Sequence, residues 1–340
     1  MWFPGEDLIK TMWVSLTDKG VGSLLTPWQL RRTSRAQIES KREEILQVAQ
    51  AEKDALDIRA GKKKLAQVGG ELLLVDHQAE VIGDRIEPTL SGAEMVNAAV
   101  AASATRAVLD EVNVAKAILH AEDILKTDES PAPSAQIDAD WLRDWRDAAA
   151  RVSSDEMQSL WGRILAEEVK SPGNCSLRAL NFVRCLSKEE AQKIEKVAPY
   201  VFDQTMILKY GSLAQTNHPL HAVEFMEMQE MGLVSSVDSM GFTGQYPSVS
   251  KEQYLRAFFC NGWALVVRDA DPTKNLQVDY YRVTPLGKQI FTLSNSRPNV
   301  EYMRELGRHW ASLGFTVSVA EAVPMEGHAG AFRFVNEQTV

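Results

Sequence analysis

The sequence lacks the long apolar runs that mark membrane helices. No stretch of the 340 residues approaches the length of about eighteen apolar residues that a membrane-spanning helix needs. The first residues also lack a basic region followed by an apolar one, so no signal peptide is expected. We therefore expect a cytoplasmic protein without an integral membrane segment.

Cysteine is scarce, and the sequence has no glycine-rich phosphate loop. Cys175, Cys185 and Cys260 are odd in number and fit no zinc-module spacing, so they are predicted to be buried free thiols. Gly69-Gly70 lacks the Lys-Ser/Thr pair that completes a phosphate loop. The sequence therefore predicts neither a metal nor another cofactor.

Charge is unevenly distributed along an otherwise ordinary globular composition. Hydrophobic residues make up 45% of the chain and charged residues 24%, and the net charge is −9. Residues 28–64 carry ten Lys/Arg against six Asp/Glu, a balance of +4, so the remainder carries −13. Such a segment fits either an anionic partner or a solvated helix face. Its basic clusters, which are the candidate nucleic-acid contacts, are Arg31, Arg32, Arg35, Lys62, Lys63 and Lys64.

The first third of the chain is predicted to be a helical arm, residues 1–126. The segment from Trp28 to about Val68 follows Pro27 and is rich in good helix formers, which predicts one long helix. A second helix is expected from about Gly92 to Lys126. The apolar stripe does not keep a heptad repeat, so a helical hairpin is favoured over a parallel coiled coil. We expect this arm to mediate homo-oligomer formation.

Residues 127–136 are predicted to be a linker and residues 137–204 a four-helix-like bundle. Two prolines among small and acidic residues mark the linker. Asp138, Ser153 or Ser154, and Ser187 are the predicted helix caps, and Glu190 completes a capping box with Ser187. The helical spacing of the bundle tryptophans predicts that they pack in its core; they are Trp141, Trp145 and Trp161.

Residues 205–323 are predicted to be a winged-helix-like module, and residues 324–340 a loose tail. A helix ends at Gly232, strands at 263–267 and 278–283 are expected to pair as the wing, and a helix begins at Thr284. The predicted fold class is mainly α with a small β component (α+β).

The charges of this module argue against a DNA-reading wing. A winged helix that reads DNA presents basic or amide side chains to the duplex. The helix before Gly232 instead carries acids, and no Lys or Arg occurs between Tyr210 and Ser250. The module is therefore expected to contact protein. The acids of its helix and loop are Glu224, Glu227, Glu230, Asp269 and Asp271.

Two stretches resemble known families. Leu160–Val169 reads LWGRILAEEV and is followed by Pro172-Gly173 and by Ser176-Leu177-Arg178. With the later Thr284-Pro285-Leu286-Gly287, this pattern resembles a bacterial family known only as a domain of unknown function, over about residues 137–320. The basic N-terminal helix is similar, more loosely, to the N-terminal regions of bacterial abortive-infection proteins. The resemblance implies a role in phage defence and supplies no catalytic residues.

Four groups of residues are candidate chemical sites, and each also has a structural explanation. His218, His221 and Glu224 share a helix face as metal ligands would, but His218 precedes Pro219 at a helix start. Asp76-His77 has no placed nucleophile, and Asp269, Asp271 and Lys274 fit a turn. The pair Glu167/Glu168 ends a helix, where the dipole disfavours acids, so we expect an ion pair with Arg163 or Arg178.

The leading hypothesis is a non-enzymatic bacterial accessory or sensor protein that acts through protein contacts, in phage defence. A nucleic-acid-binding regulator that uses the basic arm is the first alternative. A metal-dependent nuclease or other hydrolase with an unplaced site is the second.

Overall fold

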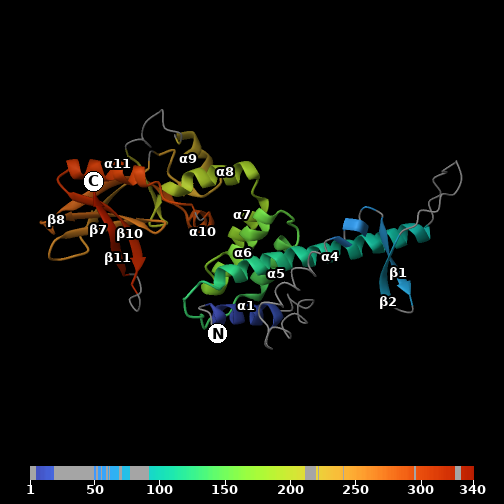
Figure 1. Ribbon diagram of the computed structural model, residues 1–340. Helices are drawn as coiled ribbons and strands as arrows, with labels where there is room; N and C mark the ends of the chain where they lie inside the picture. The colour runs from blue at the N-terminus through green and yellow to red at the C-terminus, as the bar shows by residue number, and fades with distance from the viewer. Residues whose placement is uncertain are drawn as a thin grey trace. The chain divides into compact units, whose positions relative to one another are not determined.

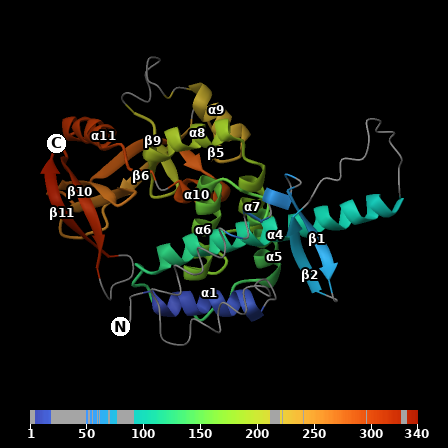
Figure 2. The ribbon, with the colours of Figure 1, turned by 45° about the vertical axis from the view of Figure 1, so that its right-hand side comes forward.

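The computed structural model divides the chain into two compact units, Met1–Leu180 and Asn181–Val340. Figures 1 and 2 show their elements from two directions. Helices are mixed with antiparallel strands, so the predicted α+β class is confirmed in its coarse form. The residues that the structure describes are 5–18, 50, 53–54, 56–58, 60, 62–68, 71–76, 92–210, 220, 222–239, 241–294, 296–325 and 331–340.

The first unit is built on the long helix α4, and α1 and α6 lie alongside it (Figure 1). The predicted helix from about Gly92 is confirmed. The second half of α4 is apolar on the face that packs against α6, where Ala117, Ile118 and Ala121 are fully buried. The described helices of this unit are α1 (Glu6–Asp18), α4 (Gly92–Leu125), α5 (Ala139–Ala149) and α6 (Asp155–Lys170); α7 (Leu177–Cys185) crosses the unit boundary.

A glycine brings α4 and α6 into close contact. A Cβ placed on Gly162 would lie 2.6 Å from His120 Cβ and 2.7 Å from the Ala117 carbonyl oxygen, so only glycine allows this approach. Beside it, the indole N–H of Trp145 donates a 2.9 Å hydrogen bond to the carbonyl oxygen of Trp161. Both indoles are buried, as is that of Trp141, so the predicted core role of the tryptophans is confirmed.

The prediction that one long helix continues to about residue 68 is wrong. Residues 19–49 lie outside the described part of the chain, and the described residues 50, 53–54 and 56–58 are helical. Lys63–Val68 is strand β1, which pairs antiparallel with β2 (Glu71–Asp76) in the register Val68↔Glu71. Two glycines separate the strands in the sequence, a typical hairpin signal, and they follow a helix-breaking Gly61.

The four helices expected in one bundle fall in different units. The caps are as predicted: Asp138 and Ser154 accept backbone hydrogen bonds at the starts of α5 and α6, and Ser187 and Glu190 form the capping box of α8 (Lys188–Val197). However, α6 packs against α4, whereas α8 packs against α9 (Ala222–Glu230) in the second unit. Residues 127–136 have no helix or strand, and Asp128 forms a 3.3 Å ion pair with Lys170 of α6.

A four-stranded antiparallel sheet in the order β11-β10-β8-β7 lies in the second unit. Its strands are β7 (Tyr254–Cys260), β8 (Trp263–Asp269), β10 (Thr316–Pro324) and β11 (Phe332–Thr339). The expected loose tail is wrong, because β11 pairs with β10 and is held by side chains. The Phe332 ring packs at a tilt of 39° against Phe259 with centroids 4.6 Å apart, and Glu337 forms an ion pair with Arg268.

The second sheet of this unit has β9 (Asn275–Val283) between β4 (Met206–Leu208) and β5 (Val234–Ser235). The short strand β3 (Val201–Phe202) adds to β4, and β6 (Phe242–Pro247) pairs with β9. The predicted wing is therefore wrong. Residues 263–267 and 278–283 lie in different sheets, and the partner of β9 along the expected wing is β6.

Helices cover the sheets of the second unit. Helix α11 (Val300–Ser312) packs against β10 and β8 through buried residues such as Leu306 and Trp310. Helix α10 (Pro285–Leu293) follows β9 directly and is capped by Thr284, as predicted. Within the described ranges, no helix is both long and apolar enough to cross a membrane.

Candidate functional site

The outward face of α9 combines exposed apolar side chains with acids. Val223 and Met226 are 56% and 45% exposed, while Phe225 and Met228 on the opposite face are buried in the unit. Lys193 of α8 forms a 2.6 Å ion pair with Glu227. Helix α9 itself contributes apolar and acidic groups and no Lys or Arg to this face, while Lys193 of α8 partly neutralises Glu227.

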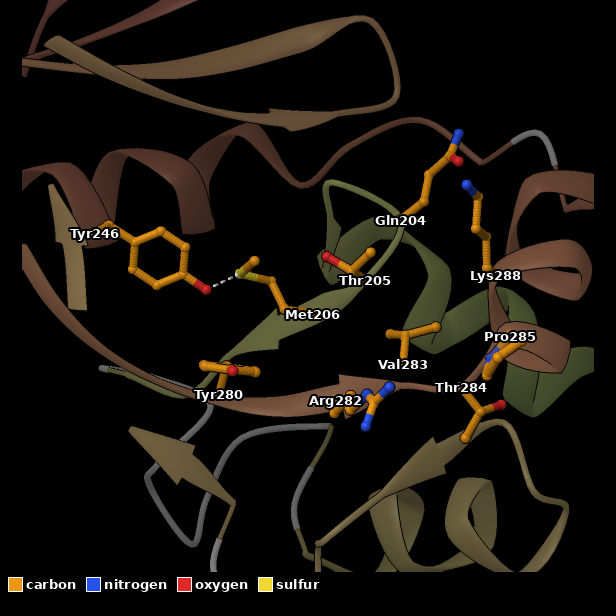
Figure 3. A pocket seen from close by; sticks show the side chains of 10 residues that line it. All are labelled: Gln204, Thr205, Met206, Tyr246, Tyr280, Arg282, Val283, Thr284, Pro285 and Lys288. Atoms are coloured by element: carbon orange, nitrogen blue, oxygen red, sulfur yellow. Dashed lines mark hydrogen bonds between the residues drawn. The ribbon is translucent and has the colours of Figure 1, made fainter. Parts of the chain in front are cut away.

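A pocket of about 330 Å³ lies where the second sheet meets the start of α10 (Figure 3). The turn after β3 and the strands β4, β6 and β9 form its walls, together with the first turn of α10. Aromatic side chains and a methionine gather at one end and polar side chains at the other (Figure 3). The lining residues are Gln204, Thr205, Met206, Tyr246, Tyr280, Arg282, Val283, Thr284, Pro285 and Lys288.

The pocket opens because β9 changes its buried face. Leu276 and Val278 are buried on one face of the strand, whereas Tyr281 and Val283 are buried on the other. Because side chains alternate along a strand, Tyr280 would continue the first face, and Arg282 lies on it too. That face is no longer covered at this point, so both side chains reach the pocket.

The opposite wall is a tight turn held by two strands. Asp203 and Gln204 both have positive φ, 49° and 55°, and with Thr205 they form the three-residue turn between β3 and β4. Asp203 exchanges hydrogen bonds of 2.7 and 2.8 Å with the backbone of Phe259, and Val283 N–H donates to the Thr205 carbonyl at 2.8 Å. Burial raises the pKa of Asp203, although the hydrogen bond with the Phe259 backbone acts to lower it. The turn is therefore fixed from both sides.

The two tyrosine rings of the pocket meet across a glycine. A Cβ on Gly244 would lie 2.9 Å from a ring atom of Tyr246 and 3.1 Å from one of Tyr280. Tyr246 donates a 3.6 Å hydrogen bond to the Met206 sulfur, and its ring lies 5.2 Å from the Arg256 guanidinium carbon. Desolvation raises the pKa of Tyr246 to about 12, so its phenol is neutral and a hydrogen-bond donor at neutral pH.

The candidate nucleic-acid residues are only partly described. Arg31, Arg32 and Arg35 lie outside the described residues, and Lys64 lies in β1 without a described side chain. Two neighbouring lysines face aspartates: Lys63 Nζ is 2.8 Å from Asp54 and 3.8 Å from Asp57, and Lys62 Nζ is 4.0 Å from Asp57.

The structure does not bring the candidate metal ligands or the candidate catalytic base pair together in the part of the chain that it describes. His77, His218 and His221 lie outside it, and Glu224 lies on α9. Among the described residues, no group of three or more His, Cys, Asp or Glu side chains is arranged to hold a metal ion.

The loop with Asp269, Asp271 and Lys274 is a turn, as the sequence favoured. Lys274 Nζ lies 2.6 Å from Asp269, and the Asp271 carboxylate accepts a 2.9 Å hydrogen bond from Thr273 N–H. Hydrogen bonds from these partners lower the pKa of both aspartates. The three groups therefore hold the loop.

Glu167 and Glu168 have separate partners among the described residues, and these are a lysine and two backbone N–H groups. Glu167 forms an ion pair with Lys170. Glu168 is buried and accepts hydrogen bonds from the backbone N–H groups of Gly173, at 2.6 Å, and Cys175, at 3.0 Å. Desolvation raises its pKa even though both hydrogen bonds lower it.

The three cysteines are free, as predicted, but only two are buried. Desolvation raises the pKa of both Cys175 and Cys260 to about 12, so these thiols are protonated at neutral pH. Cys185 is exposed at the end of α7, which corrects the prediction.

The sequence does not predict the pocket, because its residues come from three separate segments, 204–206, 246 and 280–288. One local signal was present. Asp203-Gln204 between two apolar runs is a turn-forming pair, and it separates Val201-Phe202 from Met206–Leu208.

The comparisons with known proteins give one match. A family model described as "Protein of unknown function (DUF2806)" matches residues 110–307, more than half of the chain. The range contains both the Leu160–Val169 signature and the Thr284-Pro285 helix start, so the resemblance to a family of unknown function is confirmed there. No curated protein and no solved structure matches the chain. The abortive-infection resemblance stays a prediction.

Proposed function

We propose that this chain, which belongs to the DUF2806 family of proteins of unknown function, is a non-enzymatic accessory or sensor protein. It acts through contacts with other proteins, and its second unit presents the contact surface on α9. A setting in phage defence remains part of this proposal.

The arrangement around α9 supports a winged-helix-like reading of this module. Three antiparallel strands lie in the order β4-β9-β5, so that the last of the three in the sequence is in the middle, and a helix precedes β5, as in a winged helix. In this reading β6 and β9 form the wing, and α9 takes the place of the recognition helix. Its outward face is then the surface offered to a partner.

The exposed surface of α9 is the observation that carries the proposal. Val223 and Met226 are three positions apart and lie on one helix face, with Glu230 exposed one turn further on. Exposed apolar side chains bordered by polar ones are typical of protein contact sites. The matching surface of the partner is apolar with a basic border, because the exposed Glu230 makes this border acidic, whereas Glu227 is already paired with Lys193.

The same face fits nucleic acid poorly. Phosphate contacts need Lys or Arg, and α9 has neither. In the first unit, Lys62 and Lys63 are neutralised in part by Asp54 and Asp57. The regulator alternative therefore depends on Lys64 and on the basic residues before position 50.

A co-purification experiment on the full chain tests the proposal. The variant Val223→Glu/Met226→Glu places acids in the apolar face, and Val249→Glu is the matched control because Val249 is 66% exposed elsewhere in the same unit. We expect one protein to co-purify with the wild type and the control and to be lost with the double variant. Co-purifying nucleic acid, or a partner retained by the double variant, contradicts the proposal.

A further inference from the structure

We infer that the pocket between the second sheet and α10 binds a mononucleotide, with the phosphate at its polar end and the base at its aromatic end. The inference goes beyond the proposed protein contacts, because it assigns a small-molecule site to the same module. It rests on the side chains of the pocket and requires no glycine-rich loop.

The polar end of the pocket is cationic. Arg282 and Lys288 both line it, and no Asp or Glu does. Within the described part of the chain, neither cation forms an ion pair, whereas Lys193, Lys274 and Arg268 of the same unit are all paired with carboxylates. An arginine fork and a lysine ammonium are the two side chains that proteins use most for phosphate.

The start of α10 adds to this positive potential. Pro285 and Lys288 belong to the first turn of the helix, whose dipole has its positive end here. Gln204 lies near Lys288, across the pocket from Arg282, and offers an amide to ligand oxygens (Figure 3). An anion bound between these groups meets positive charge from a side chain on each wall and from the helix.

The other end of the pocket suits a planar, uncharged group. Tyr246, Tyr280 and Met206 gather there (Figure 3). Tyrosine faces bind nucleobases by stacking without requiring a particular base. The Tyr246 phenol oxygen, which donates its proton to the Met206 sulfur, keeps lone pairs that accept hydrogen bonds at the same end. A phosphate alone would leave these rings unused, whereas a nucleoside monophosphate contacts both ends.

The size and stiffness of the pocket favour a small ligand. Its volume of about 330 Å³ is near the lower limit of small-molecule sites. The Asp203-Gln204 turn is held by Phe259, and Thr205 is held by Val283, so one wall is organised before a ligand arrives. A preformed site of this kind loses less conformational entropy on binding.

Isothermal titration of the full-length protein tests the assignment. The probes are the four ribonucleoside 5′-monophosphates, adenosine, inorganic phosphate and a single-stranded oligonucleotide. We expect at least one monophosphate to bind about tenfold or more tightly than adenosine or phosphate alone, because each half of the ligand contributes.

Three variants and one control locate the site. Arg282→Gln and Lys288→Gln should each weaken monophosphate binding about tenfold, since each removes a charge-assisted hydrogen bond. Tyr280→Leu should weaken the monophosphate and leave phosphate unchanged. Lys251→Gln, which removes an exposed lysine of the same unit, should have no effect. Thermal melts check that every variant is folded.

Several results would overturn the inference. One is the absence of monophosphate binding at millimolar concentration. Another is binding that Arg282→Gln and Lys288→Gln leave unchanged. A preference for the oligonucleotide that falls steeply with salt would assign the pocket to nucleic acid instead. Loss of nucleotide binding would leave the co-purification result unaffected, so the two proposals fail separately.

Discussion

The Thr284 hydroxyl donates a 2.6 Å hydrogen bond to the carbonyl oxygen of Gly232, and so joins the start of α10 to the end of α9. Thr284 N–H donates to the Leu233 carbonyl at 2.9 Å. The same carbonyl oxygen would lie 2.0 Å from a Cβ on Gly287, so the helix start rests directly on this turn. One wall of the pocket is therefore fixed to the helix that carries the proposed contact surface.

Thr284→Val should lower the free energy of unfolding by about 1–2 kcal/mol. The substitution removes the helix cap, where the hydroxyl oxygen accepts from Gly287 N–H at 3.0 Å, and the bond to Gly232. Urea denaturation measures the change. Thr284→Ser keeps the hydroxyl and should retain most of the stability, and equal losses in the two variants would mean that the hydroxyl has no role.

Trp161→Ala should cost about 3–5 kcal/mol of stability, since it removes a large, buried aromatic side chain of α6. Thermal melts measure the loss. Trp161→Phe should cost less, because the indole nitrogen of Trp161 has no hydrogen-bond partner among the described residues. An unchanged melting temperature for Trp161→Ala would show that the side chain is outside the core.

Glu168 should make stability depend on pH in the acidic range. Its pKa is raised in the folded protein, so the folded state keeps a proton that the unfolded chain has already lost. The stability that Glu168 contributes by holding this proton is fully present below the ordinary glutamate pKa. It is lost as the pH rises through the pKa of Glu168 in the folded state. Denaturation at several pH values should show that the free energy of unfolding falls less with rising pH in Glu168→Gln than in the wild type over that window. Parallel curves would contradict the assignment.

Self-association is expected to involve the first half of α4. Met95, Val96 and Val100 are 58%, 62% and 61% exposed on this helix. Val96→Glu/Val100→Glu should reduce the mass measured by light scattering at high concentration, because two acids would enter the apolar contact, while glutamate preserves the helix. Val249→Glu is the control. A wild type that stays monomeric, or a double variant with unchanged mass, would contradict this surface.

Local features of the fold could be predicted from the sequence. The caps at Asp138, Ser187 and Thr284 depend on residues within a few positions of one another, and their helices begin where expected. The apolar spacing of α6 likewise gave the buried Trp161.

Strand pairing could not be predicted in the same way. The sequence places β8 and β9 next to each other, with a turn-rich loop between them, but β8 pairs with β7 and β10 and β9 with β4, β5 and β6. The strand pairing follows from which apolar side chains each sheet buries, and not from the short loop between β8 and β9. The pocket depends on those pairings, because Tyr280 and Arg282 face it only where the buried face of β9 changes.

Photo-crosslinking in cells that naturally contain the protein tests the central claim most directly. A photoreactive amino acid replaces Met226 on the exposed face of α9, and a second variant carries it at Val249. We predict a crosslink from position 226 to one protein, absent from position 249 and abolished by adding Val223→Glu. A crosslink from position 226 to nucleic acid, or the same products from both positions, would contradict the account.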